Sequence, residues 1–315
     1  MTVQNPSATW WRGLSEVPGT LGRTAVVIGN FDGVHRGHQA VIERAKELAG
    51  DLPLVAVTFF PHPMAVVRPD IAPRILTDAV KRAELLRAVG ADAVLTIPFD
   101  LEVASWSPDE FAREVLVDRL HAALVVVGDN FRYGHKAAGD VACLTAFGAE
   151  YDFRVEGLAL AGDAAAWCST DVRKLVADGD VEAAAAVLGH PTTVRGVVVR
   201  GDQRGRELGF PTANLPADDK VAVPADGVYA GWLTRLDTQE RFPAAISVGT
   251  NPTFEGVVGR RVESYVLDAS PDLYGVEVEV AFVARIRGMV AFTTVEALID
   301  VINDDVTRTR EILDL

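Results

Sequence analysis

The stretch AVVIGNFDGVHRGH, residues 25–38, decides the fold of the first half of the chain. Its apolar run at 25–28 is typical of a buried parallel strand, and the turn that follows leads into a helix expected at 36–49. A strand that enters a helix points backbone N–H groups and the positive end of the helix dipole at one spot. This order of elements therefore favours a phosphate-binding site.

The residues of the turn fit the same purpose. Gly29 lets the backbone come close to a ligand, and the two histidines, His35 and His38, can donate to phosphate oxygens whose charge grows in a transition state. A satisfied pair of surface histidines at a helix cap is an equally weighted alternative for this short pattern taken alone.

Bulk composition narrows the class of protein. The 315 residues suffice for two domains, and an apolar fraction of 49% without an unbroken run of membrane-spanning length predicts a cytoplasmic protein with no membrane partner. The two cysteines, Cys143 and Cys168, have no metal-ligand spacing. A net charge of −14 argues against an extended nucleic-acid surface, because such a surface needs clustered Lys and Arg.

Hydrophobic periodicity divides the chain near residue 187 into domains 1–186 and 187–315. After an irregular lead-in to residue 22, the first domain alternates strands with helices, which predicts a doubly wound parallel sheet. Its further strands are expected at 52–59, 93–97, 124–127 and 155–160, and its further helices at 78–89, 108–120, 169–177 and 181–188. Pro61 and Pro63 are expected to stop any helix after the second strand.

The second domain has a different pattern, with short strands broken by Gly, Pro and Asn turns. Strands are expected at 194–200, 228–236, 243–248, 261–267 and 276–283. The pattern predicts an antiparallel β-barrel and a terminal packing helix at 294–313. The face of this helix expected to pack on the barrel comprises Val295, Leu298, Ile299, Ile302 and Val306.

Four segments of the first half follow strands or open helices at one edge of the expected sheet. They are GNFDGVHRGH at 29–38, TFFPHP at 58–63, GDNFRYGHKAAG at 128–139 and CSTDVR at 168–173. In this order they resemble the nucleotidyltransferase domain of bifunctional bacterial riboflavin kinase/FAD synthetases. An ordinary serine cap followed by a surface arginine explains CSTDVR when it is taken alone.

The resemblance implies an adenylyl-transfer site in which FMN phosphate attacks the α-phosphorus of ATP. ATP contacts are then implied for Gly29, Phe31, His35, His38, Asn130, Ser169, Thr170 and Arg173, with catalytic roles for His35, His38 and Arg173. Flavin contacts are implied for Pro61, His62, Pro63 and Asn130. The family usually has an acidic residue in place of Phe60 and a serine in place of Cys168, so the chain departs from its pattern at two positions.

A second constellation lies in RGDQRGRELGFPTANL, residues 200–215. Gly201 and Gly205 permit a flap over phosphate, although a glycine-rich hairpin is the simpler explanation for the glycines alone. Thr212 and Asn214 occupy alternate positions of an extended segment, so both neutral oxygens can face one Mg²⁺ bound to ATP.

This string is similar to the riboflavin kinase motif of the same family, and DGVYAG, SVGTNPTF and RVESYVLD follow in the family's order. The resemblance implies that Glu263 is the general base for the ribityl hydroxyl, and that Asn251 and Thr253 line the nucleotide or flavin region. Local alternation alone favours an outward-facing strand glutamate at 263. Near the end of the chain, Val290 and Ala291 replace residues that are commonly charged in the family.

We therefore expect a bifunctional enzyme that makes FMN from riboflavin and FAD from FMN, with ATP as co-substrate and Mg²⁺ as cofactor. Two alternatives remain open at this point. One is a riboflavin kinase whose adenylyltransferase is impaired by Phe60 and Cys168, and the other is a flavin-binding regulator without catalysis. The sequence sets no oligomeric state.

Overall fold

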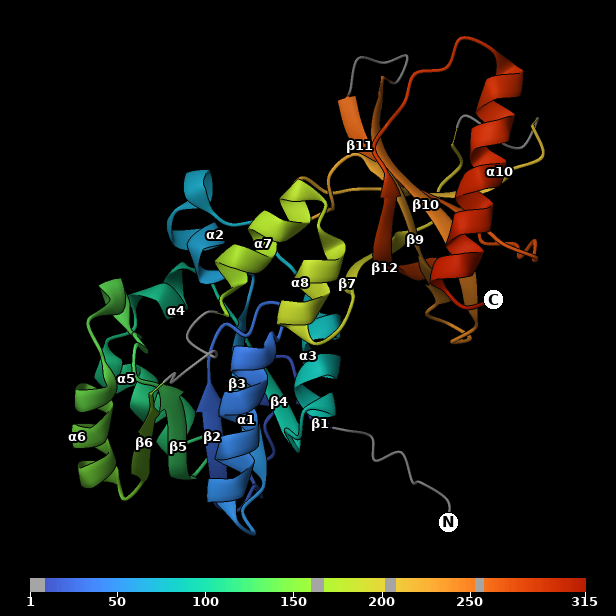
Figure 1. Cartoon of the computed structure of the whole chain (residues 1–315). Helices are drawn as coiled ribbons and strands as arrows, with labels where there is room; N and C mark the ends of the chain where they lie inside the picture. The colour runs from blue at the N-terminus through green and yellow to red at the C-terminus, as the bar shows by residue number, and fades with distance from the viewer. Residues whose placement is uncertain (1–8, 160–166, 202–207, 253–257) are drawn as a thin grey trace, which may run out of the picture. The chain divides into compact units, whose positions relative to one another are not determined.

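The computed structural model describes residues 9–159, 167–201, 208–252 and 258–315 (Figure 1). These form two compact units, Met1–Cys168 and Ser169–Leu315. The domain boundary expected near residue 187 stays a prediction. Among the described helices, none combines the length and the apolar character that crossing a membrane requires.

The first unit is built on a parallel sheet of six strands in the order β1-β4-β3-β2-β5-β6. The strands are β1 Thr9–Trp11, β2 Thr24–Ile28, β3 Leu54–Phe60, β4 Ala93–Pro98, β5 Ala122–Gly128 and β6 Arg154–Leu158. Every residue of β2 is buried, as expected for a central strand covered on both faces. The predicted doubly wound parallel sheet is confirmed.

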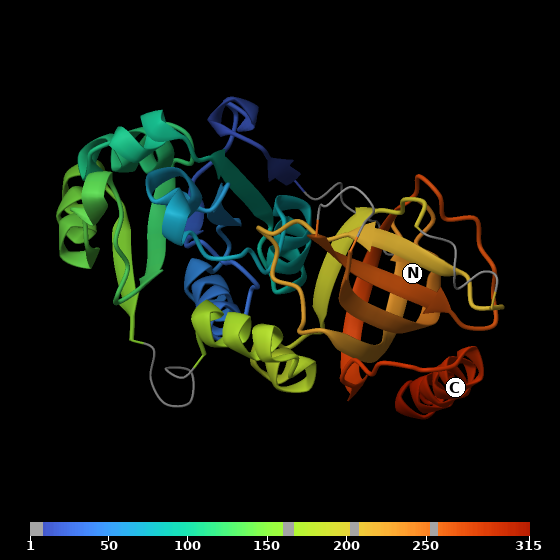
Figure 2. The same ribbon diagram turned by 90° about the horizontal axis from the view of Figure 1, so that it is seen from above.

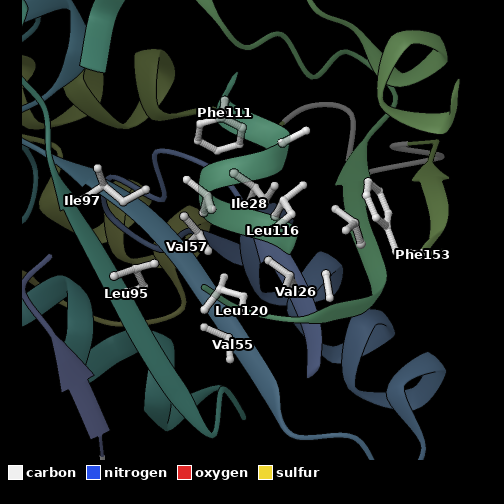
Figure 3. Close-up of a cluster of buried hydrophobic side chains, with 14 of the residues drawn as sticks. Val26, Ile28, Val55, Val57, Leu95, Ile97, Phe111, Leu116, Leu120 and Phe153 are labelled. Atoms are coloured by element: carbon white, nitrogen blue, oxygen red, sulfur yellow. The ribbon is translucent and has the colours of Figure 1, made fainter. Parts of the chain in front are cut away.

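Helices cover both faces of this sheet. They are α1 Arg36–Ala49, α2 Pro63–Val67, α3 Ala79–Ala88, α4 Leu101–Ser105, α5 Pro108–Phe111 and α6 Val141–Tyr151, and a π-helical segment, Ala112–Val117, continues α5. Alternate strand residues point to opposite faces: Val26 packs in one core cluster with Phe111 and Leu116, shown in Figure 3, and Val27 packs in another with Ile42 of α1. The two apolar faces of the central strands therefore fix the three-layer arrangement.

Two sequence expectations for this unit are wrong. The lead-in contains β1, an edge strand parallel to β4 in which Trp10 Nε1 donates to Thr96 Oγ1 at 2.9 Å; three residues are too few to show a period. The loop after β3 does not stop a helix at Pro63, because Pro63 occupies the first turn of α2, where its missing N–H costs no hydrogen bond.

The second unit begins with α7 Ser169–Asp178 and α8 Val181–Leu188 and continues as an antiparallel sheet in the order β7-β12-β9-β10-β11-β8. Its strands are β7 Thr192–Val197, β8 Thr212–Pro216, β9 Gly227–Arg235, β10 Arg241–Pro252, β11 Val258–Val266 and β12 Glu277–Arg287. The sheet curls (Figure 2) until Val199, just after β7, forms a bridge with Asn214 of β8. The predicted barrel is confirmed.

The terminal helix α10 Val295–Ile312 packs against this sheet, with Thr294 as its cap. Val295, expected on the packing face, is 52% exposed, whereas Asp305 and Thr309 are buried. Asp305 tolerates burial because Arg287 of β12 donates to both of its carboxylate oxygens at 2.8 and 2.7 Å. The packing face is therefore partly polar, which apolar periodicity does not detect.

Two candidate active sites

The first candidate site lies where the winding of the parallel sheet reverses. From β2 the chain proceeds to β3 and β4 on one side, and it then returns to β5 on the other side of β2. Ligands of open α/β sheets bind outside the carboxyl ends of the strands at such a switch point. The turn of residues 29–35 follows β2 there, and the turn that contains Asn130 follows β5.

The turn after β2, residues 29–35, has an unusual backbone. Phe31 and Val34 are both buried and both have positive φ, 50° and 41° respectively. A positive φ is sterically unfavourable for a β-branched residue such as Val34. A Cβ atom at Gly29 would lie 3.0 Å from the Phe31 ring, so glycine allows that ring to fold back on the strand end.

The two histidines come together at the start of α1. His35 is the cap, and its Nδ1 accepts from the backbone N–H of His38 at 3.4 Å, while the two rings stack with centroids 3.7 Å apart. A Cβ atom at Gly37 would lie 3.1 Å from His35 Nδ1, so this position favours glycine. The predicted proximity of the histidines is present, and so is the cap that the alternative interpretation required.

The surroundings of His38 favour its neutral form. Burial is the largest cause of a pKa well below the usual value for histidine, followed by the charges of His35 and Arg82. Its Nδ1 is buried and has no hydrogen-bond partner among the described residues, while the edge of Phe31 contacts the ring at a centroid distance of 5.2 Å. A neutral imidazole donates from one nitrogen only, so this side chain offers a single donor to a ligand.

The other residues expected at this site lie on three segments. Asn130 is exposed, and its Oδ1 lies close over Gly128, 3.1 Å from where a Cβ atom would be. Pro61 is exposed, Pro63 is half-buried, and His62 is buried and caps α2, with its Nδ1 accepting from Met64 N at 3.2 Å. His62 thus has a structural contact that the sequence did not indicate.

Ser169, Thr170 and Arg173 open α7, which belongs to the second unit. Val172 and Val176 are buried on this helix, whereas Thr170 is exposed. The other end of α7 is held by Arg285 of β12, whose Nη1 donates to Asp178 O at 3.2 Å. The role of the three polar side chains in nucleotide binding stays a prediction.

The second candidate site is built by strand register in the barrel. Glu263 of β11 pairs directly with Asn214 of β8, and Tyr265 pairs with Thr212. Directly paired residues of antiparallel strands point to the same face. Thr212, Asn214 and Glu263 therefore share one face, which the alternation along a single strand could not decide.

The oxygens on this face fit a bound cation. Asn214 Nδ2 donates to the hydroxyl and the carbonyl oxygen of Thr212, both at 3.2 Å, and this fixes the orientation of the amide. The other amide atom, Asn214 Oδ1, is buried without a partner among the described residues. A buried acceptor of this kind, on the same face as a hydroxyl and a carboxylate, suits Mg²⁺ carried by a nucleotide.

Gly201 lies close to this amide, since a Cβ atom there would come within 2.5 Å of Asn214 Oδ1. Sequence reasoning missed Ser247 of β10, which pairs with Glu263 on its other side and so lies on the same face. The order of the strands is the signal that would have found it. The predictions for Gly205 and Thr253 fall outside the described residues, as does that for the side chain of Asn251.

The fold and the two sites define a class of protein: an α/β unit of nucleotidyltransferase type in one chain with a kinase-type barrel. A family model of FAD synthetase matches residues 18–170, and one of riboflavin kinase matches residues 188–313. Together they cover most of the chain, in the order of the two units.

Curated relatives make the identification specific. The "Bifunctional riboflavin kinase/FMN adenylyltransferase" of Escherichia coli strain K12 is 35% identical over 92% of this chain and 93% of its own length. The protein of the same name from Listeria monocytogenes is 36% identical over 90% and 91%. A crystal structure described as a macrolide-efflux protein from Streptococcus pneumoniae is 30% identical, with a TM-score of 0.81 over 96% of this chain and 98% of that one. The chain belongs to the bifunctional riboflavin kinase/FMN adenylyltransferase family.

Proposed function

We propose that the chain catalyses two consecutive reactions, the phosphorylation of riboflavin to FMN and the adenylylation of FMN to FAD, both at the expense of ATP. The observation that carries this proposal is the match of both family models to one chain, each over the unit that contains its proposed site. The alternatives of a kinase alone and of a non-catalytic regulator are not favoured, since the relatives carry both names over nearly their full length.

In the kinase reaction, Glu263 accepts the proton of the terminal ribityl hydroxyl as its oxygen attacks the γ-phosphorus of ATP. The bond from that phosphorus to the ADP oxygen breaks, and ADP leaves. Thr212 Oγ1 and Asn214 Oδ1 would hold a Mg²⁺ ion, which neutralises charge on the triphosphate. Support comes from the shared face of these residues and from the unpartnered oxygen of Asn214.

In the adenylyl transfer, an oxygen of the FMN phosphate attacks the α-phosphorus of ATP and pyrophosphate leaves. Because this nucleophile is already ionised, the site needs donors and orientation rather than a general base. His35, His38 and the backbone of the turn are proposed to bind the phosphates, with Ser169, Thr170 and Arg173 holding the pyrophosphate as it departs.

The remaining assignments are part of the same proposal. Gly29, Phe31 and Asn130 contact ATP at the first site, while Gly201 and Gly205 do so at the second. Flavin contacts at the first site are Pro61, His62, Pro63 and Asn130, and those at the second are Asn251 and Thr253. The cytoplasmic location expected from the sequence also stays a proposal.

One incubation distinguishes the bifunctional enzyme from the two alternatives. Purified full-length protein is mixed with riboflavin, ATP and Mg²⁺, and the flavins are separated over time. FMN followed by FAD supports the proposal, FMN alone would mean that only the kinase works, and an unchanged riboflavin pool would contradict catalysis. Supplying FMN with ATP tests the second reaction independently of the first.

A further inference from the structure

One residue of the turn, Asp32, belongs to a buried ion pair for which the proposed reactions assign no role. Asp32, in the middle of the turn, accepts from Arg82 of α3, with Nη2 and Oδ1 3.0 Å apart. Each side chain is only 1% exposed. Removing two charges this completely from water costs free energy, so the presence of the pair requires an explanation.

The pair ties the turn to two other segments. Asp32 Oδ1 also accepts from the backbone N–H and the hydroxyl of Thr77, at 3.0 and 3.1 Å, and the same hydroxyl oxygen accepts from Gly33 N at 3.1 Å. Arg82 in turn donates to the carbonyl oxygens of Phe59, at the end of β3, and of Thr77, both at 3.0 Å. The turn is thus bonded to β3 and to the start of α3 by charged groups in a dry environment.

The conformation that this network holds is a strained one. Asp32 stands between the two buried residues with positive φ, Phe31 and Val34, and Val34 leads directly into His35. Such backbone conformations persist only where the surroundings fix them more firmly than the local chain does. The planar guanidinium fork of Arg82 and the two carboxylate oxygens of Asp32 supply several directed hydrogen bonds to this turn and its neighbours.

We propose that Asp32 and Arg82 are positioning residues for adenylyl transfer: they hold the turn in the conformation that presents His35 and His38 to the nucleotide. The inference rests on the proposed role of these histidines. Neither partner is assigned a contact with the substrates; they act on the turn through the hydrogen bonds given above, and the charge of Arg82 also acts on His38. If the pair served stability alone, its loss would not lower kcat selectively. A positioning role predicts that kcat falls while the KM for ATP changes little.

The test uses two conservative variants of the full-length protein, Arg82→Lys and Asp32→Asn. Arg82→Lys keeps the charge but loses the fork, and Asp32→Asn keeps the shape but loses the charge. We expect the kcat of FAD formation from FMN to fall about 10- to 100-fold, because small displacements of catalytic groups have effects of that order. The KM for ATP should change less than about threefold, since the ground state needs less exact geometry.

Controls separate positioning from general stability. Lys46→Met removes another ion pair of the first unit, the one with Asp92, and should leave FAD formation within about twofold. The rate of riboflavin phosphorylation in each preparation shows that the second unit is folded. Hydrogen exchange of the β2 and β5 amides shows the same for the first unit, and all three variants should keep wild-type protection there.

Three results would overturn the inference. The first is an unchanged kcat in both pair variants, and the second is an equal fall in the kcat of FAD formation in Lys46→Met. The third is loss of β2 and β5 protection in Arg82→Lys, which would make the pair a determinant of the whole unit. His35→Ala and His38→Ala report on the proposed function instead: if both still form FAD, the proposed function fails rather than this inference.

Discussion

The two candidate sites obtain their geometry in different ways. In the first unit, a short turn with two strained residues is held by a buried ion pair and delivers two stacked histidines to a helix cap. In the second unit, Thr212, Asn214 and Glu263 lie on regular strands, where the hydrogen-bonded ladder places them on one face. A turn depends on distant contacts for its shape, whereas a ladder needs only its register.

The chemistry differs in a corresponding way. The proposed nucleophile of the second site is an alcohol, which must lose a proton, and a carboxylate lies on that face. The proposed nucleophile of the first site is an ionised phosphate, and the side chains proposed to bind phosphate there are two histidines, while Asp32 of the same turn is paired with Arg82. Each proposed site thus offers the kind of group that its own nucleophile requires.

The largest expected effect is that of removing the carboxylate of the second site. Glu263→Gln should lower FMN formation by about 10²- to 10⁴-fold, the usual contribution of a general base. FAD formation from supplied FMN should stay within about twofold of the wild type. Both rates are measured by chromatography of the flavins on one preparation.

Glu277→Gln is the matched control, since Glu277 is an exposed glutamate of β12 in the same barrel. It should change neither rate. Loss of FAD formation in Glu263→Gln, with the fold intact, would contradict the separation of the two sites. An unchanged kinase rate would remove Glu263 from its proposed role and favour the outward-facing glutamate instead.

A smaller effect is expected from Thr212→Val, which preserves shape but removes one oxygen from the proposed cation site. The kcat/KM for riboflavin phosphorylation at limiting Mg²⁺ should fall at least about tenfold and recover partly as Mg²⁺ is raised. Thr238→Val, at an exposed turn of the same unit, is the control. A loss that is independent of Mg²⁺ would argue that Thr212 only orients Asn214.

Much of the fold could be predicted from the sequence because its signals are local. The bounds of α1 agree with the expected 36–49, since an apolar face begins at a turn and ends at Gly50. Burial of both faces made β2 and β5 recognisable as apolar runs. Elements without a period were missed or misread, as β1 and α2 illustrate.

The candidate sites were predictable as residues but not as geometry. Nothing local links Asp32 to Arg82, which lie 50 positions apart, and no residue preference predicts a positive φ at Val34. Likewise, Glu263 lies on the face of β11 opposite the buried Val262 and Ser264, and only the pairing of β11 with β8 shows that Asn214 shares this face. Long-range packing supplies what the chain pattern leaves open.

The first site should respond to pH through His38, and the effect should be modest. Because the folded-state pKa of His38 lies well below that of a free histidine, the unfolded chain binds the proton first as pH falls. The stability of the first unit should therefore decrease as pH drops below about 6.5, the unperturbed value, toward the folded-state pKa. His38→Gln should show a shallower decrease.

Urea unfolding of both proteins between pH 7 and 5 measures the difference, and NMR of the His38 ring locates its titration directly. The charged groups that influence this ring are His35 on the same turn and Arg82 on α3, the partner of Asp32. A ring that titrates like a free imidazole would contradict the buried, neutral state described for this site.

The smallest effect is expected where a charge pair is exposed. Arg310 of α10 donates to both carboxylate oxygens of Asp268, at 2.7 and 2.6 Å, and the pair lowers the pKa of Asp268, yet both side chains are open to solvent. Water and salt screen such a pair, so Arg310→Ala should shift the melting temperature by no more than about 4 °C and leave both reactions unchanged. Calorimetry at low and high salt checks this, and a large shift would mean that α10 is held by surface charge rather than by its buried face and the pairing of Asp305 with Arg287.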